Sequence, residues 1–265
     1  MSSFLLIYLA AGALAGLLAG LMGLGGGIVI VPMLNLLFSW QNMPPELIQL
    51  MALGTSMASI MFTSVSSFRA HHKRGAVLWR IVFRIAPGIV IGAFLGTRLA
   101  SFMPVTLLRG TFAVFLALVS IQMFLNLKPN PTREFKGVAG ITLIGFCIGL
   151  VSGLVGIGGG SLSVPTLTWH NVAMHTAVGT SSAIGLPIAV AGAIGYIING
   201  WGNALLPQFS LGYVYLPALI CLVATSVLTA PLGVRLAHRL PVPRLKKIFG
   251  VLFLLLAFRM LMLVF

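Results

Sequence analysis

Acidic residues are almost absent from this 265-residue sequence, and charge of either sign is scarce. Glu46 and Glu134 are the two acids, against 16 Lys and Arg, and charged residues make up 7% of the chain while apolar residues make up 59%. Few soluble domains tolerate so little surface charge. Apolar stretches of about 20 residues recur along the chain, which indicates a polytopic α-helical membrane protein. Because the stretches are continuous and do not alternate, a β-barrel is excluded.

The shortage of acids also limits the chemistry. Both acids lie at or beyond the ends of the apolar stretches, so a cation site or a carboxylate proton relay within the membrane is disfavoured. Cys147 and Cys221 lie inside apolar stretches and form no metal-binding pattern, so we expect neither metal nor cofactor. Gly160-Ser161 resembles part of an intramembrane serine-protease motif, but the GxSxG spacing is absent and no span offers a convincing histidine partner. We therefore expect no enzymatic activity.

Basic residues gather in short loops between the apolar stretches. Loops 69–80, 127–137 and 235–247 hold twelve of the 16 Lys and Arg, whereas loops 39–45 and 200–212 hold none. This is the positive-inside pattern of membrane proteins, so the expected partner of the basic residues is the lipid bilayer and not nucleic acid. It predicts that the three basic loops are cytoplasmic and that both termini lie outside.

Two glycine clusters interrupt the apolar stretches and match each other. Gly23-Leu24-Gly25-Gly26-Gly27 and Gly156-Ile157-Gly158-Gly159-Gly160 are each followed by a proline five residues after the last glycine, Pro32 and Pro165. A glycine cluster makes a poor lipid-facing helix, because its backbone needs hydrogen-bond partners that lipid does not supply. Paired broken helices are typical of transport sites.

Further landmarks extend this repeat along the chain. A shift of 133 residues superimposes the two clusters, and a shift of 125 superimposes Gly54-Thr55-Ser56 on Gly179-Thr180-Ser181. A shift of 137 superimposes Leu95–Ala100 on Leu232–Ala237. Three landmarks in the same order indicate an internal duplication. The expected fold is an all-α polytopic membrane protein with two inverted-topology repeats, each a glycine-tipped helical hairpin plus three transmembrane helices.

Loop charge also sets the expected boundaries. Two clear spans lie between the cytoplasmic loops 127–137 and 235–247, so the glycine-interrupted segment must cross an even number of times and is expected to be a hairpin. The first repeat is predicted at 1–127, with a hairpin at 4–38 and spans at 46–68, 81–99 and 106–126. A cytoplasmic linker is predicted at 128–137, and a second repeat at 138–265, with a hairpin at 138–169 and spans at 174–199, 213–234 and 244–264. Residues 4–22 lack a basic n-region, so we expect them to be retained.

The two glycine tips are the expected site for an anion. A helix that starts after a tip points its free N–H groups and the positive end of its dipole at the membrane centre, and glycine lets an anion approach closely. Ser161 and Ser163 follow the second tip where Ile28 and Ile30 follow the first, so we expect an asymmetric site. The residues predicted to bind substrate are Gly25, Gly26, Gly27, Thr55, Ser56, Gly158, Gly159, Gly160, Ser161, Ser163, Thr180, Ser181 and Ser182.

Several of these features have a structural alternative. Small residues and hydroxyls such as those of the Gly-Thr-Ser triplets also pack transmembrane helices closely. Arg84 and Arg109 lie near span ends, where snorkelling to headgroups competes with a role in attracting an anion. His170 and His175 flank the cytoplasmic end of the second hairpin, where a solvated histidine competes with a proton sensor.

The paired GxGGG-x4-P stretches, the Gly-Thr-Ser triplets and the two four-segment halves together resemble the TauE/SafE family of sulfite and organosulfonate transporters. The resemblance covers essentially the whole chain. It implies an inner-membrane protein that moves small sulfur-containing anions such as sulfite, thiosulfate or sulfoacetate, and we predict an exporter that works by alternating access. A selective anion channel and a carrier for another small organic anion stay open as alternatives, as does assembly into a homo-oligomer.

Overall fold

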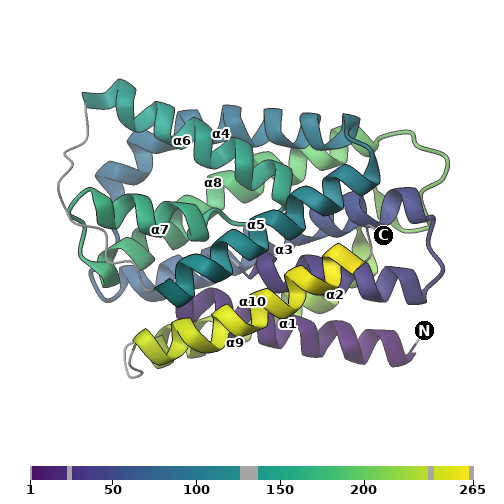
Figure 1. Ribbon diagram of the computed structural model, residues 1–265, viewed down its shortest axis with the longest axis horizontal. Helices are drawn as coiled ribbons and strands as arrows, with labels where there is room; N and C mark the ends of the chain where they lie inside the picture. The colour runs from purple at the N-terminus through teal and green to yellow at the C-terminus, as the bar shows by residue number, and fades with distance from the viewer. Residues whose placement is uncertain (1, 23–25, 126–136, 238–241, 263–265) are drawn as a thin grey trace.

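The computed structural model describes residues 2–22, 26–125, 137–237 and 242–262, and these residues are almost entirely helical (Figure 1). The helices are α1 (Ser2–Met22), α2 (Gly27–Trp40), α3 (Pro45–His72), α4 (Trp79–Phe102), α5 (Val105–Leu125), α6 (Gly137–Val155), α7 (Gly160–Trp169), α8 (Met174–Gly200), α9 (Leu216–Ala237) and α10 (Val242–Met262). Among the described residues, seven helices are long and apolar enough to cross a membrane. The chain is therefore an all-α, multi-pass membrane protein.

A short β-ladder is the one sheet in these ranges. Strands β1 (Ser210–Leu211) and β2 (Val214–Tyr215) pair antiparallel around Gly212, whose φ of 54° favours glycine. Helix α9 consequently begins at Leu216, three residues later than the start of the span expected at 213–234. The ladder lies in the connection that carries no charge, before the chain enters α9.

Two helical hairpins contain the glycine clusters. Helices α2 and α7 have 14 and 10 residues, which correspond to lengths of about 21 and 15 Å, so neither reaches across an apolar layer of about 30 Å. The first arms α1 and α6 are longer, 21 and 19 residues, and each is long enough to cross. In Figure 1, α1 begins and α2 ends at one end of the bundle, whereas α6 begins and α7 ends at the opposite end.

The two halves of the chain are predicted to be repeats of inverted topology. The division at 127 and 138 and the inverted topology stay predictions, and all but the last residue of the expected linker 128–137 lies outside the described residues. The packing nevertheless has paired features. Helix α1 packs along α9 and α6 packs along α4, while α3 and α8 contact each other at the centre. The most apolar windows of α3 and α8 are 83% and 67% buried, against 50% or less for the other five candidate spans.

Rows of glycine bring the outer helices close together. Gly12, Gly16 and Gly20 lie one turn apart on α1, and a Cβ at any of them would overlap backbone or side-chain atoms of α9. Gly145, Gly149 and Gly153 do the same for α6 against α4. Close backbone approach through small residues at four-residue spacing is how many membrane helices associate. These two tight pairs flank the central helices.

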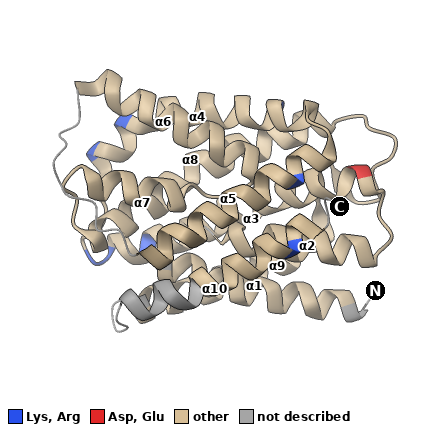
Figure 2. Ribbon diagram, viewed as in Figure 1, with Lys and Arg blue, Asp and Glu red and all other residues tan. Residues whose placement is uncertain are grey.

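Charge is distributed unevenly along the bundle (Figure 2). Most Lys and Arg of the described residues lie at the end where α3 finishes and α4 starts. The last turn of α3 contains Arg69, His71 and His72, and its first turn contains Glu46. The bundle therefore has a basic end, which the positive-inside rule predicts to face the cytoplasm.

Candidate anion site at the glycine tips

Both short helices begin after a glycine in the left-handed conformation. Gly26 has a φ of 77° and precedes α2, and Gly159 has a φ of 73° and precedes α7. An L-residue with a side chain rarely adopts this conformation, which explains the glycine at both positions. Gly25, also predicted to bind substrate, lies outside the described residues.

Each of these helices starts with backbone N–H groups that have no acceptor in their own helix. In α2, the first N–H group with an acceptor at the start of the helix is that of Val29, which donates to the Gly26 oxygen at 3.1 Å. In α7 it is the N–H of Leu162, which donates to the Gly159 oxygen at 3.0 Å. The N-cap residues are glycines and carry no capping side chain, so the N–H groups of Gly27, Ile28, Gly160 and Ser161 have no acceptor within their own helices. A buried helix start of this kind suits an anion.

The two tips meet, although they are far apart in sequence. A Cβ at Gly27 would lie 2.7 Å from the Gly156 oxygen and 3.0 Å from the Ser56 Oγ. The Ser56 hydroxyl, on α3, donates to the Gly156 oxygen at 3.0 Å. Ser56 therefore contacts both tips. All three residues are buried.

Hydroxyl groups surround the second tip. The Ser163 hydroxyl donates to the Gly159 oxygen at 2.9 Å, and its Oγ lies 2.8 Å from the Oγ of Ser181 on α8. The Oγ atoms of Ser152 and Ser161 are buried and have no hydrogen-bond partner among the described residues. The Ser152 Oγ would lie 3.2 Å from a Cβ at Gly159. The second tip thus has two buried hydroxyl donors that have no acceptor in the described part of the chain.

The first tip has an apolar lining at the corresponding positions. Ile28 and Ile30, which align with Ser161 and Ser163, are each 1% exposed and belong to the hydrophobic core. The two tips therefore differ in their polar groups, as the two sequences require.

Three other predicted residues use their hydroxyls to hold the chain. The Thr55 Oγ1 accepts the N–H of Tyr215 at 2.9 Å, and the Thr180 Oγ1 accepts the N–H of Leu78 at 3.0 Å. The hydroxyl of Ser182 accepts from Ser67 at 3.2 Å and donates to a backbone oxygen one turn earlier. The threonine contacts join α3 and α8 to the segments that precede α9 and α4, and the Ser67–Ser182 contact joins α3 to α8. A role of these residues in binding substrate stays a prediction.

Two of the charged residues considered near the span ends, Arg109 and His170, make contacts away from the glycine tips. The Arg109 guanidinium donates to the Pro45 oxygen at 3.3 Å, where α3 begins. The Nδ1 of His170 lies 2.7 Å from the Thr166 oxygen, at the far end of α7 from its glycine tip. The groups at the tips are therefore backbone amides and hydroxyls.

Sequence reasoning missed two contributors to this region. Ser152 lies one helical turn before the second glycine cluster, and this spacing could have identified it from the sequence as a residue near the tip. Gly185 of α8 was not singled out, but a Cβ there would lie 3.2 Å from the Gly158 oxygen and 3.0 Å from the Ser64 Oγ. Nothing in the local sequence around Gly185 indicates that it faces a tip.

Comparison with known proteins supports a transporter. The family described as "Sulfite exporter TauE/SafE" matches residues 8–260. A "Probable membrane transporter protein" of Haemophilus influenzae is 37% identical over 262 residues, covering 98% of this chain and 99% of its own length. The "Probable membrane transporter protein" YdhB of Bacillus subtilis is 30% identical and covers 73% of this chain and 79% of its own. YunE, given the same description in that organism, is 32% identical and covers 77% and 82%.

No solved structure matches the chain significantly. The family match extends over nearly the whole length, and it includes both glycine tips and all the central helices. The sequence resemblance noted above is thereby confirmed. The chain belongs to the Sulfite exporter TauE/SafE family of membrane transporters.

Proposed function

We propose that this protein exports a small sulfur-containing anion, such as sulfite, thiosulfate or an organosulfonate like sulfoacetate, across the cell inner membrane by alternating access. The anion binds near the membrane centre, between the N-termini of α2 and α7. Backbone N–H groups after Gly26 and Gly159 hold it, together with the hydroxyls of Ser152 and Ser161, which have no hydrogen-bond partner among the described residues. Sulfur oxyanions suit such a site because they accept several hydrogen bonds at once.

The observation that carries this proposal is the contact between the two tips. Gly27 at the start of α2, Ser56 and Gly156 of the second cluster lie together in the interior, so the two glycine clusters that precede α2 and α7 meet there. A dipole of about half an elementary charge at the N-terminus of each helix favours negative charge near this point. The unpartnered hydroxyls of Ser152 and Ser161 add donors beside it.

Burial of the tips supports a carrier cycle. Gly26, Gly27 and Gly158–Gly160 are all buried, so an anion at this point is separated from both aqueous sides. A carrier must open such a site to one side at a time. A broken helix can move as a unit about its glycine, because glycine accepts backbone angles that other residues do not.

The test is transport by purified protein in liposomes. We expect saturable uptake of labelled sulfite, accelerated by sulfite or thiosulfate loaded on the opposite side. Such counterflow is the property of a carrier, whereas a channel gives large unitary currents without it. Large currents would overturn the alternating-access proposal and support the channel.

Substitution at the tips tests the site. Gly159→Leu and Gly26→Leu place a side chain at a left-handed position beside the proposed anion and should abolish flux. Gly202→Leu is the matched control, because Gly202 has a similar φ of 78° but nothing lies within 4 Å of its added Cβ. All three variants should elute as folded protein. Wild-type flux in both tip variants would show that the anion does not bind at the tips.

A further inference from the structure

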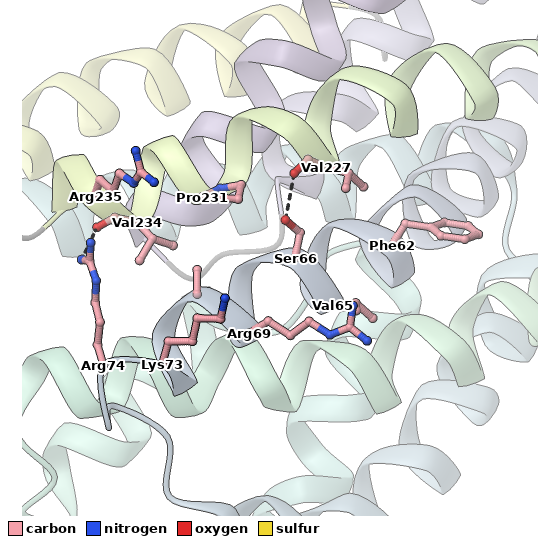
Figure 3. Close-up of a pocket in the computed structure, with 11 residues that line it drawn as sticks. Phe62, Val65, Ser66, Arg69, Lys73, Arg74, Val227, Pro231, Val234 and Arg235 are labelled. Carbon is pink, nitrogen blue, oxygen red and sulfur yellow. Dashed lines mark hydrogen bonds between the residues drawn. The ribbon is translucent and has the colours of Figure 1, made fainter.

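A groove of about 600 Å³ lies between α3 and α9, at the basic end of the bundle (Figure 3). Two hydrogen bonds join its walls. The Ser66 hydroxyl donates to the Val227 oxygen at 2.8 Å, and the Arg74 guanidinium donates to the Val234 oxygen at 3.2 Å. The two helices are thus held at both ends of the groove, which is a fixed feature of their packing.

The groove is separate from the glycine tips. Arg69 follows Ser56 by 13 residues on the same helix, a distance of about 20 Å at 1.5 Å per residue. The Thr63 and Ser226 hydroxyls, 2.9 Å apart, close the contact between α3 and α9 on the buried side. A ligand in the groove therefore does not occupy the proposed transport site.

The lining of the groove divides into an apolar part and a cationic part. Phe62, Val65 and Val227 line the part that lies toward the middle of α3 and α9. Lys73, Arg74 and Arg235 line the part near the ends of these helices, and the side chain of a fourth cation, Arg69, extends toward Val65 (Figure 3). All four are exposed. This order along the membrane normal, apolar inside and positive at the surface, matches an amphiphile with an anionic headgroup.

The cations lack a counter-charge in the described part of the protein. Glu46 is the one acid there, and it lies 23 residues before Arg69 on α3, about 35 Å away. The sequence repeat sharpens the contrast, because Arg235 corresponds to Arg98 and Arg74 corresponds to Asn199. Arg98 donates to the Asn199 Oδ1 at 2.9 Å. In the groove, the corresponding pair consists of two cations, so a bound anion would supply the missing partner.

We propose that this groove binds an anionic phospholipid from the cytoplasmic leaflet. The phosphate lies among Arg69, Lys73 and Arg235, and an acyl chain runs along Phe62 and Val227. A free inorganic anion would satisfy the cations but leave the apolar part unfilled. The groove is also too large for one, since its volume equals that of roughly 20 water molecules at about 30 Å³ each.

Native mass spectrometry of the detergent-purified protein tests the proposal. Phosphatidylglycerol and phosphatidylcholine are titrated separately, and then phosphatidylglycerol is titrated in the presence of inorganic phosphate. We expect phosphatidylglycerol to bind more tightly than phosphatidylcholine. We expect inorganic phosphate at the same concentration as the lipid not to displace phosphatidylglycerol. In Arg69→Gln/Lys73→Gln the affinity for phosphatidylglycerol should fall about thirtyfold, since each cation near a membrane surface contributes about fivefold.

Two further variants separate the groove from general surface charge. Arg80→Gln removes a cation that is exposed at the same end of the bundle but does not line the groove, and it should bind phosphatidylglycerol like wild type. Val65→Trp keeps all the cations but fills the apolar part, and it should lose the lipid. Equal loss in Arg80→Gln, unchanged binding in Val65→Trp, or displacement by phosphate would each overturn the proposal. Elution as monodisperse protein verifies that each variant is folded.

Discussion

The hydroxyl of Ser56 donates a 3.0 Å hydrogen bond to the carbonyl oxygen of Gly156, across 100 residues of sequence. The bond connects α3, the most buried of the candidate spans, with the tip of the second hairpin. Because Gly27 lies against the same two atoms, this contact sets how closely the start of α2 approaches the second glycine cluster. The distance between the tips would determine how well one anion can contact both of them.

Ser56→Ala should therefore reduce transport more than its effect on stability explains. Loss of one neutral buried hydrogen bond costs about 1 kcal/mol. Ser120→Ala is the matched control, because the Ser120 hydroxyl donates a buried 2.8 Å bond to the Gly250 oxygen in a different helix pair. We expect similar falls in melting temperature and a loss of sulfite flux in Ser56→Ala alone. Equal flux in the two variants would show that the Ser56 bond is only structural.

Ser163 and Ser181 should be coupled in a double-mutant cycle. Their Oγ atoms are 2.8 Å apart, and Ser163 also donates to the carbonyl of the tip glycine. We expect the two alanine substitutions to be non-additive by about 1 kcal/mol in the free energy of unfolding. We also expect either substitution alone to raise the KM for sulfite, because each disturbs the hydroxyl beside the α7 N-terminus. Additive stability effects with an unchanged KM would contradict this account.

The glycine rows should matter for stability and not for substrate choice. Gly16→Ala would place a Cβ against the Ser226 oxygen of α9, so the two backbones would have to move apart, at a cost of about 1–3 kcal/mol. Gly110→Ala, on α5, meets nothing within 4 Å and should be neutral or stabilising by up to about 1 kcal/mol. Thermal unfolding in detergent measures both. A Gly16→Ala protein as stable as Gly110→Ala would show that the α1–α9 contact is looser than described.

Local chemistry made the hairpins predictable. Glycine clusters inside apolar stretches predict breaks, and the helices do start at Gly27 and Gly160, directly after glycines that need a positive φ. The role of the prolines was not decided by the sequence. Pro32 and Pro165 lie at the sixth position of their helices, where each removes one helical N–H donor instead of starting the helix. The carbonyls left without that donor are those of Ile28 and Ser161, close to the tips.

Contacts between distant segments were not predictable from the sequence. The repeat predicts that two tips exist, but no periodicity gives the distance from Ser56 to Gly156. The four-residue spacing of Gly12, Gly16 and Gly20 is visible in the sequence, yet it does not identify α9 as the partner. In each case the missing information is tertiary, because a small residue or a hydroxyl shows that a close neighbour is tolerated without showing which neighbour it is.

Thr55 and Thr180 provide the last test, because their contacts favour a structural role over the predicted contact with substrate. Each Oγ1 accepts a backbone N–H from the residue directly before a helix, Tyr215 before α9 and Leu78 before α4. A valine of nearly the same shape removes that acceptor, so Thr55→Val and Thr180→Val should each lose up to about 1 kcal/mol of stability. Their KM for sulfite should equal that of wild type. If the KM rises while the melting temperature stays unchanged, the threonines contact the anion and the structural interpretation is wrong.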